Sequence, residues 1–282
     1  MAGIDLPYNY IARDYQIPFF QAMYSGIRRA VLVWHRRSGK DKTALNFLIP
    51  EAVKRVGAYY HLFPTYNQGQ KVIWDGIDKD GFKVLDHFPR EIIARKNETE
   101  MKIHLVNGSI YQVVGTDHFD RIVGPNPVGC IFSEYALQDP RAWDLIRPIL
   151  RENNGWAVFC YTPRGKNHGY RLYQMAKRNP KWFCQLLTVD DTVHEGRRVF
   201  SQEDIAEEIK EGMDPDLVQQ EFYCSWEGAA QGSYYGKLLA EAERAGRIGR
   251  VPWEPQHRVD TWWDLGIDDY MAIWFTQATS RE

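Results

Sequence analysis

A short polar loop at residues 35–41 (HRRSGKD) follows an apolar run and precedes a segment with helical spacing. A strand, a tight Gly-Lys turn and a helix N-terminus form the arrangement in which backbone N–H groups surround a phosphate and a lysine reaches its oxygens. The match is partial, because Trp34 stands at the usual first glycine and Asp41 at the usual Ser/Thr. Such a pair is commonly an ordinary turn, but two arginines in so short a loop are costly without an anion. The loop is a candidate phosphate site.

A second motif ends the apolar run 128–132, which leads into Ser133 and Glu134. In open α/β sheets the ligand crevice lies at the carboxyl ends of the strands, so we expect Glu134 to face the same crevice as the Gly39-Lys40 turn. A carboxylate in that place suits the activation of water for attack on a phosphate. The alternative is a solvated glutamate at the end of a strand.

Two further segments fit the same site. Residues 162–168 (TPRGKNH) form a polar turn directly after the apolar run 156–161. Gln16 lies ahead of the first apolar run, and a glutamine amide can pair with both the acceptor and the donor of an adenine edge. Each segment alone is also compatible with a surface turn or a surface glutamine. Three strand-end motifs in this order favour a nucleotide site.

The elements that must position these residues are read from hydrophobic periodicity. Apolar runs typical of buried parallel strands alternate with segments of helical spacing such as 42–55 and 68–78. This alternation predicts an α/β domain with a mostly parallel sheet flanked by helices. The predicted strands are 30–34, 58–63, 109–114, 128–132 and 156–161.

The character of the chain changes after about residue 190. Residues 201–211 are acidic and helical, with Ser201 and Asp204 as possible caps, and Pro215 opens another helix. A polar, proline-containing stretch then precedes a new strand at 259–265. We therefore predict a core at 1–190, a helical lid or linker subdomain at 191–255, and the start of another domain at 256–282.

Composition excludes several classes of protein. The 282 residues carry a formal charge of −2, so any contact with DNA must come from local clusters such as Arg164-Lys166-Arg171 and Lys177-Arg178-Lys181. The four cysteines and eight histidines show no metal-binding spacing, and the cysteines are expected to be reduced core thiols. No apolar run reaches the roughly 18 residues of a membrane span, which favours a cytosolic protein without a membrane partner.

With these motifs in view, the chain resembles the large terminase subunit of tailed bacteriophages. That family joins a P-loop ATPase of the ASCE, RecA-like class to an RNase H-like nuclease, and it assembles as a ring on a portal to translocate DNA into a capsid. The resemblance covers nearly the whole chain. It is carried by Gln16, 36–41, 63–66 with Gln70, 121–126, 132–136, 162–165 and 219–228.

The resemblance implies roles for single residues. Lys40 would bind phosphate, Glu134 would polarise the attacking water, and Thr162 would belong to the motif that couples hydrolysis to movement. Arg36 would match the family's loop arginine. The positions expected to bind ATP are Gln16, Arg36, Arg37, Ser38, Gly39, Lys40, Asp41, Lys42 and Thr162.

Arg121 lies where the family often carries an arginine that reaches a neighbour's active site. In this chain Val123 stands directly before Gly124, where related sequences often have arginine. A catalytic role in trans and a DNA-binding or structural role are therefore both open for Arg121.

The metal positions depart from the usual pattern. Most P-loop ATPases place a Ser/Thr after the lysine and an aspartate before the catalytic glutamate, and both support Mg²⁺. Here Asp41 and Ser133 occupy those places, so the carboxylate and the hydroxyl have exchanged strands. Since Mg²⁺ accepts oxygen ligands from either side, we predict that both residues serve it. The alternative is that Asp41 only caps the helix.

Residues 260–269 resemble the opening strand of the nuclease domain, with Asp264 as its first metal-binding aspartate. A two-metal nuclease needs several converging carboxylates, and the chain ends before they arrive. We expect nuclease activity from the full-length protein and none from this chain.

The predicted function is ATP hydrolysis that drives double-stranded DNA into a procapsid. The expected cofactors are ATP and Mg²⁺, and the expected partners are DNA, the portal protein, the small terminase subunit and further copies in a ring. The isolated chain is expected to be a monomer, and the setting is the cytoplasm of a bacterial host. The alternatives are a helicase-like nucleic-acid remodelling ATPase and a degenerate, non-enzymatic P-loop scaffold.

Overall fold

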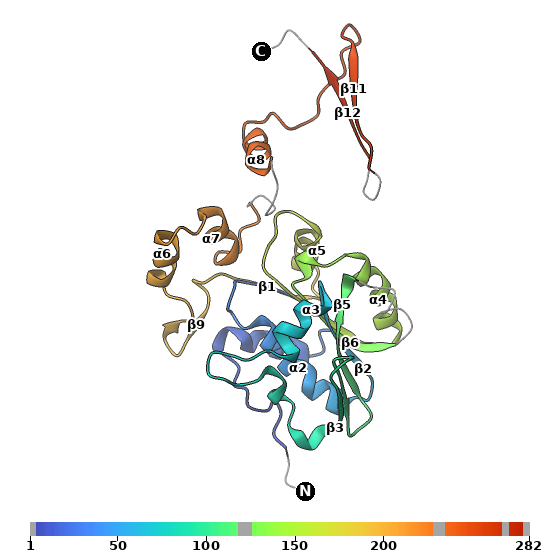
Figure 1. The fold of residues 1–282 in the computed structure, drawn as a ribbon, viewed down its shortest axis with the longest axis vertical. Helices are drawn as coiled ribbons and strands as arrows, with labels where there is room; N and C mark the ends of the chain where they lie inside the picture. The colour runs from blue at the N-terminus through green and yellow to red at the C-terminus, as the bar shows by residue number, and fades with distance from the viewer. Residues whose placement is uncertain (1–3, 118–125, 228–234, 267–270, 279–282) are drawn as a thin grey trace. The chain divides into compact units, whose positions relative to one another are not determined.

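A computed structural model describes residues 4–117, 126–227, 235–266 and 271–278 (Figure 1). The chain forms two compact units, Met1–Gly236 and Lys237–Glu282, which are described separately. Arg121 lies outside the described residues. In the part of the chain that is described, no helix is long and apolar enough to cross a membrane.

The first unit is built on an eight-stranded sheet in the order β3-β4-β5-β2-β6-β7-β1-β8. All neighbours from β5 to β8 pair in parallel, whereas β3 and β4 are antiparallel additions at one edge. The predicted mostly parallel sheet is confirmed. The strands are β1 (Arg29–Trp34), β2 (Ala58–Phe63), β3 (Ile93–Asn97), β4 (Lys102–Leu105), β5 (Ile110–Gly115), β6 (Pro127–Ser133), β7 (Trp156–Tyr161) and β8 (Phe183–Leu187).

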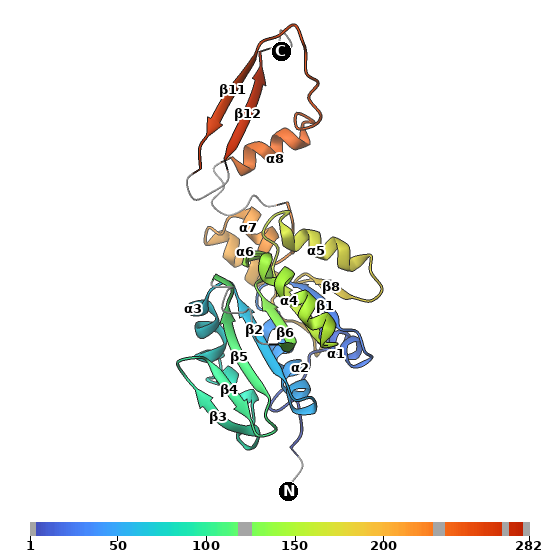
Figure 2. The same cartoon turned by 90° about the vertical axis from the view of Figure 1, so that its right-hand side faces the viewer.

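Helices cover both faces of this sheet (Figure 2). In β1, Leu32 packs into the core on the side of α1 and α2, whereas Val33 packs into the core on the side of α4 and α5. Strands buried on both faces are continuously apolar, which explains why they were recognisable in the sequence. The helices are α1 (Ile17–Tyr24), α2 (Lys40–Lys54), α3 (Tyr66–Gly69) with a π-helical turn (Gln70–Trp74), α4 (Arg141–Glu152) and α5 (His168–Lys177).

Short elements connect these layers. The 3₁₀ turns are Asp14–Gln16, Val84–His87, Arg90–Ile92 and Tyr135–Leu137, and the small hairpin consists of β9 (Val193–His194) and β10 (Arg197–Arg198). Helix α2 begins two residues earlier than the predicted 42–55, directly after Gly39. The helical segment predicted at 68–78 occupies 66–74 instead.

Two helices follow the sheet in the first unit, α6 (Gln202–Lys210) and α7 (Pro215–Glu221). The predicted cap is present, because the Ser201 hydroxyl accepts from the Asp204 N–H and the Asp204 carboxylate accepts from the Ser201 N–H. Both helices bury side chains in one small apolar cluster of Val189, Ile205, Val218 and Phe222. The division into core and lid remains a proposal.

The second unit contains α8 (Gly236–Arg244) and an antiparallel pair, β11 (Val259–Asp264) and β12 (Ala272–Gln277). Strand β11 matches the strand predicted at 259–265 to within one residue. Its tryptophans Trp262 and Trp263 are exposed, and so is Asp264 at its end.

Candidate active site

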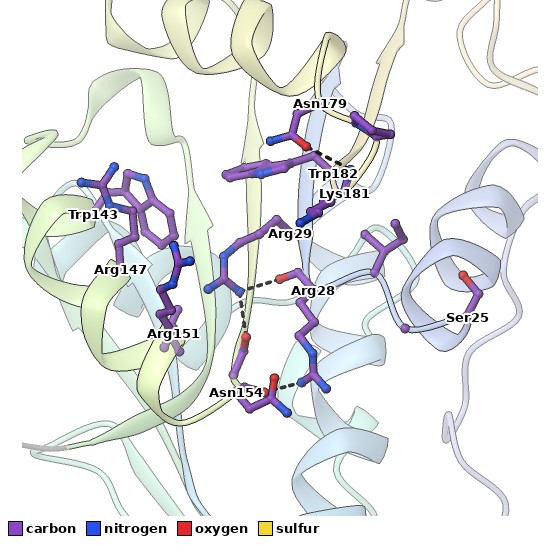
Figure 3. Close-up of a pocket in the computed structure, with 15 residues that line it drawn as sticks. Ser25, Arg28, Arg29, Trp143, Arg147, Arg151, Asn154, Asn179, Lys181 and Trp182 are labelled. Carbon is purple, nitrogen blue, oxygen red and sulfur yellow. Dashed lines mark hydrogen bonds between the residues drawn. The ribbon is translucent and has the colours of Figure 1, made fainter.

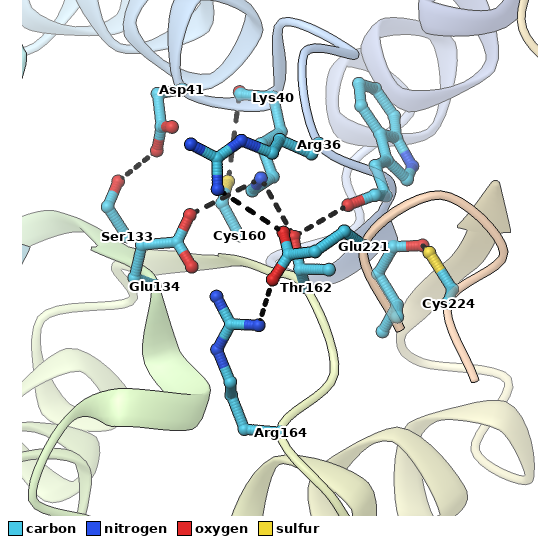
Figure 4. Close-up of polar contacts among 12 residues, drawn as sticks. Arg36, Lys40, Asp41, Ser133, Glu134, Cys160, Thr162, Arg164, Glu221 and Cys224 are labelled. Carbon is cyan, nitrogen blue, oxygen red and sulfur yellow. Dashed lines mark hydrogen bonds and ion pairs between the residues drawn. The ribbon is translucent and has the colours of Figure 1, made fainter. Parts of the chain in front are cut away.

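The predicted chemical residues meet at one edge of the sheet. Strands β6, β7 and β1 are consecutive neighbours and run parallel, so their carboxyl ends lie side by side. Glu134 follows β6, Thr162 follows β7, and the loop that contains Lys40 follows β1. Figure 4 shows these side chains turned toward one another.

The loop after β1 has a backbone suited to an anion. Arg37 and Gly39 adopt left-handed conformations, with φ of 67° and 84°, and α2 starts at Lys40. Glycine tolerates this conformation without a steric cost, and the resulting sharp turn leads into a helix N-terminus. The Ser38 carbonyl is held from behind by the Tyr15 hydroxyl at 2.7 Å and by the amide of Gln16 at 3.2 Å.

Lys40 is buried between two other site residues. Its Nζ donates to the Thr162 hydroxyl at 3.3 Å and lies 3.4 Å from Oε1 of Glu134. Burial is the largest influence on its pKa and lowers it, but Glu134 and Asp41 together outweigh that effect and raise the pKa above its usual value. The amine is therefore a fixed positive charge.

Glu134 has a strained backbone, with φ of 53° and ψ of 42° directly after β6. A residue other than glycine in this region costs free energy, and such residues cluster at functional sites. Its side chain is 21% exposed and forms the ion pair with Lys40. The carboxylate is thus near the phosphate loop and open to water.

Asp41 and Ser133 are in direct contact. The Ser133 hydroxyl, at the end of β6, donates a short hydrogen bond to Oδ1 of Asp41 in the first turn of α2. The cap position of α2 is occupied by Gly39, and Asp41 lies two residues further along the helix. The carboxylate and the hydroxyl therefore form one polar pair beside the phosphate loop.

Two buried residues behind this pair were not singled out in the sequence. Nε2 of His61 lies 2.8 Å from the Ser133 hydroxyl, and Nδ1 lies 3.1 Å from the Tyr111 hydroxyl. Burial lowers the pKa of His61 to about 3, so the ring is neutral. The only signal in the sequence was a histidine within the otherwise apolar strand 58–63.

A third missed residue is Glu221, at the end of α7. Its side chain is 4% exposed, accepts a short hydrogen bond from Arg164, and lies 3.8 Å from the guanidinium of Arg36. The Arg36 backbone N–H also donates to the Glu221 carbonyl at 2.8 Å. Glu221 thus connects α7 to both the phosphate loop and the loop after β7.

Comparison with known proteins agrees with this geometry. The large terminase subunit of Thermus virus P23-45 is 26% identical over 169 residues, which are 55% of this chain and 35% of that protein. The large terminase subunit of Escherichia phage T5 is 29% identical over 120 residues, which are 38% of this chain and 27% of that protein. This chain is similar in sequence to large terminase subunits. No protein-family model matches it.

Solved structures of terminases share the fold. The ATPase domain of the Thermus phage P74-26 large terminase matches with a TM-score of 0.61 and 18% identity, covering 79% of this chain and all of that one. The large terminase of another thermophilic bacteriophage, in complex with ADP, matches with a TM-score of 0.61 and 12% identity, covering 95% of this chain and 65% of that one. The predicted resemblance and P-loop α/β fold are confirmed.

The chain spans about a third of the length of the curated proteins that it matches. A helicase-like remodelling enzyme is not favoured by these relatives.

The remaining predicted residues lie around the site or away from it. The Gln16 amide oxygen accepts from the Tyr10 hydroxyl and the Arg13 N–H, so its visible contacts hold the loop, and adenine recognition stays a prediction. Arg37 is exposed. Lys42 forms an ion pair with Asp78 at 3.5 Å.

Asp264 belongs to the second unit. Among the residues that the structure describes, no group of three or more His, Cys, Asp or Glu side chains could hold a metal ion. A nuclease site at Asp264 stays a prediction, as does the role of Arg121.

Proposed function

We propose that this chain is the ATP-hydrolysing motor part of a large terminase subunit, which drives double-stranded DNA into a viral procapsid. The observation that carries the proposal is the meeting of Lys40, Glu134 and Thr162 at the carboxyl edge of the sheet. The names of the curated relatives support the same function. The proposed cofactors are ATP and Mg²⁺.

The phosphates of ATP would be contacted by backbone N–H groups and by cationic side chains. Backbone N–H groups of the loop and the amine of Lys40 would surround the β and γ phosphates, with Arg36 as a second cation at the loop. Arriving phosphate competes with Glu134 for the Lys40 amine, because both are anions beside the same buried cation. Binding of ATP would therefore release the Glu134 carboxylate from Lys40, so that it can act on a water molecule.

Glu134 is the proposed general base. Its carboxylate would orient a water molecule and accept a proton from it as the water oxygen bonds to the γ-phosphorus and the bond to ADP breaks. The strained backbone at the end of β6 fixes the position of this carboxylate before substrate arrives. Thr162 accepts a hydrogen bond from Lys40, so a shift of the Lys40 amine on phosphate binding or release would also move the loop after β7.

The Asp41–Ser133 pair fits Mg²⁺. The pair offers one carboxylate, from the first turn of α2, and one hydroxyl, from the end of β6, which are oxygen donors of the kind that this cation prefers. Bound Mg²⁺ would neutralise charge on the β and γ phosphates. The contact between the two side chains supports the exchange of carboxylate and hydroxyl between strands.

We propose that DNA contacts a basic cavity of about 820 Å³ (Figure 3). It lies at the amino ends of β1 and β7, away from the phosphate loop. Of the fifteen described residues that line it, none is acidic, and the cations among them are Arg28, Arg29, Arg147, Arg151 and Lys181. Like charges crowded in this way repel one another, so a phosphate backbone would relieve the repulsion. Burial, aided by Arg28 and Arg151, lowers the pKa of Arg29.

The cavity shares Lys181 with the predicted cluster Lys177-Arg178-Lys181, and the contacts of the cations favour it over the predicted cluster Arg164-Lys166-Arg171. Arg28 and Arg29 donate to the backbone carbonyls of Asn154 and Gly155, just after α4. Arg147 lies 3.8 Å from Asp144, and Arg151 and Lys181 stand at the rim. In the cluster Arg164-Lys166-Arg171, by contrast, Arg164 is bound by Glu221 and Lys166 lies 3.8 Å from Glu227.

By the same resemblance, the proposed partners are the portal protein, the small terminase subunit and further copies of the chain in a ring, within the host cytoplasm. Isothermal titration of the chain with ATP and Mg²⁺ tests the core of the proposal. Binding at a single site with Mg²⁺-dependent turnover is expected. Absence of any nucleotide binding would leave the chain as a P-loop scaffold.

A further inference from the structure

Four side chains from four elements form one continuous hydrogen-bonded chain. Tyr111 of β5, His61 of β2 and Ser133 of β6 are all completely buried, and Asp41 of α2 is at the end that faces the phosphate loop. The distances are 3.1 Å from the Tyr111 hydroxyl to Nδ1 of His61 and 2.8 Å from Nε2 to the Ser133 hydroxyl. The last contact is the short bond from Ser133 to Asp41.

Proton counting gives the direction of each bond for an ionised carboxylate and a ring that carries one proton. An ionised carboxylate only accepts, so the single proton of Ser133 points to Asp41. Ser133 must then accept from His61, which places the ring proton on Nε2. A neutral ring has one such proton, so Nδ1 accepts and the Tyr111 hydroxyl donates.

The chain leaves two oxygen positions open at the phosphate loop. The serine oxygen has two lone pairs, and one of them is occupied by His61. Oδ2 of Asp41 accepts no hydrogen bond among the residues that the structure describes, whereas Oδ1 is occupied by Ser133. These two open positions are the ones that a cation beside the phosphates would use.

We propose that His61 and Tyr111 are positioning residues that orient Ser133 and Asp41 as paired ligands of the ATP-bound Mg²⁺. The proposal rests on the proposed nucleotide site and deepens it. Partners behind metal ligands fix ligand orientation, and their loss typically weakens metal affinity 10–100-fold. In this chain the position usually held by an aspartate is held by a serine, and the relay supplies the orientation that a rotatable hydroxyl lacks.

A purely structural role for His61 is the competing explanation. The ring also lies 4.8 Å from that of Phe63 and contacts Tyr111, so its replacement would disturb packing in any case. Stability alone therefore decides nothing. The two explanations differ in the proton position on the ring and in the dependence on metal.

The first test reads the tautomer of His61 in the chain without nucleotide or metal. Nitrogen chemical shifts of ¹⁵N-histidine-labelled protein distinguish a ring protonated on Nε2 from one protonated on Nδ1, and the His61→Gln spectrum assigns the signal. We expect a neutral ring with the proton on Nε2, and a change at Nδ1 in Tyr111→Phe. A proton on Nδ1 would overturn the proposal.

The second test measures ATP affinity by calorimetry with and without Mg²⁺. Mg²⁺ is expected to increase the affinity for ATP, and His61→Leu should reduce this increase by about 10-fold. The affinity for ATP without metal should stay unchanged. His61→Gln should recover most of the increase, because an amide can accept from Tyr111 and donate to Ser133. Equal losses in the two variants would show that the relay does not matter.

The matched control is Tyr59→Phe. Tyr59 is a buried tyrosine of β2 whose hydroxyl lies 2.7 Å from the backbone carbonyl of Arg55 and 2.9 Å from that of Glu51, and its one proton is shared between them. Tyr111→Phe should change the Mg²⁺ dependence and Tyr59→Phe should not; the same change in both would refute the relay. If the unmodified chain binds no Mg²⁺–ATP, the proposed function fails, and the tautomer still decides the relay.

Discussion

Nζ of Lys40 lies 3.4 Å from Oε1 of Glu134, so the proposed phosphate ligand and the proposed base neutralise each other without nucleotide. Lys40→Ala removes a charge-assisted phosphate contact and should weaken ATP binding by about 10–100-fold, from roughly 1.5–3 kcal/mol. Glu134→Gln should keep binding within about threefold and lower turnover by about 10²–10⁴. Calorimetry and a phosphate-release assay measure the two effects.

The two variants must differ for these roles to hold. Glu134→Gln also leaves the buried Lys40 charge free for phosphate, so its affinity should not fall. Equal loss of binding in both variants would make Glu134 a structural partner of Lys40.

The contact between Asp41 and Ser133 allows a test of the exchanged metal ligands. Asp41→Ser and Ser133→Asp should each impair Mg²⁺-dependent hydrolysis, because each leaves two like groups in place of a carboxylate–hydroxyl pair. The double variant restores one of each and should recover much of the rate, with a coupling of about 0.5–3 kcal/mol. Rates of the three variants against Mg²⁺ concentration give the coupling. Simple addition of the two losses would mean that Asp41 acts only on the helix end.

Parts of this site could be predicted from the sequence for a physical reason. Strands buried on both faces are continuously apolar, and parallel strands end at the same edge, so the polar residues after β1, β6 and β7 had to meet. The edge strand β3 has no fully buried residue, and β4 alternates buried and half-buried residues over only 4 positions, so neither was recognised.

The residues that were missed depend on packing between distant segments. His61 reaches Ser133 and Tyr111 only because β2 lies between β5 and β6, which is set by the strand order. Glu221 reaches Arg164 only because α7 packs back against the loops at the sheet edge. His61 was marked only as a polar residue in an apolar strand, and Glu221 only as part of the segment 219–228, and neither pattern indicates the partner side chains.

Glu221 holds two arginines, and its neutralisation should have opposite effects on stability and binding. Glu221→Gln leaves the mostly buried Arg164 without its counter-charge and should lower the unfolding free energy by about 2 kcal/mol. The same change frees Arg36 for phosphate, so ATP affinity should stay equal or increase. Urea unfolding and calorimetry measure both.

The control for Glu221 is Glu227→Gln. Glu227 is 79% exposed and pairs with Lys166 at 3.8 Å, so its loss should change stability by less than about 0.5 kcal/mol. A weaker affinity for ATP in Glu221→Gln would contradict the competition between Glu221 and phosphate for Arg36.

The basic cavity predicts a defined salt dependence of DNA binding. Each phosphate contact contributes a slope of about −0.9 in log K against log salt. The double variant Arg147→Ala/Arg151→Ala should therefore reduce the slope by about 1.8, for duplexes of any sequence. Lys166→Ala/Arg171→Ala, from the other predicted cluster, should change it less. Fluorescence anisotropy at several salt concentrations gives the slopes. A larger change in Lys166→Ala/Arg171→Ala would place the DNA contact at the cluster Arg164-Lys166-Arg171 instead.

His35 makes stability depend on pH, because it lies completely buried directly before the phosphate loop. Burial lowers its pKa from 6.5 to about 4, and its Nε2 lies 2.8 Å from the Thr192 hydroxyl. Between these two pH values the unfolded chain binds a proton that the folded chain does not, so the unfolding free energy falls as the pH falls. The loss approaches about 1.4 kcal/mol per pH unit and totals about 3 kcal/mol below pH 4.

His35→Asn removes this proton uptake, whereas all other titrating groups are common to both proteins. Urea unfolding between about pH 7 and 4.5 gives the unfolding free energy of both proteins at each pH. The free energy of the variant should fall less steeply with falling pH, and in the middle of this range the difference in slope should correspond to about one bound proton. Parallel pH profiles would mean that folding does not lower the pKa of His35.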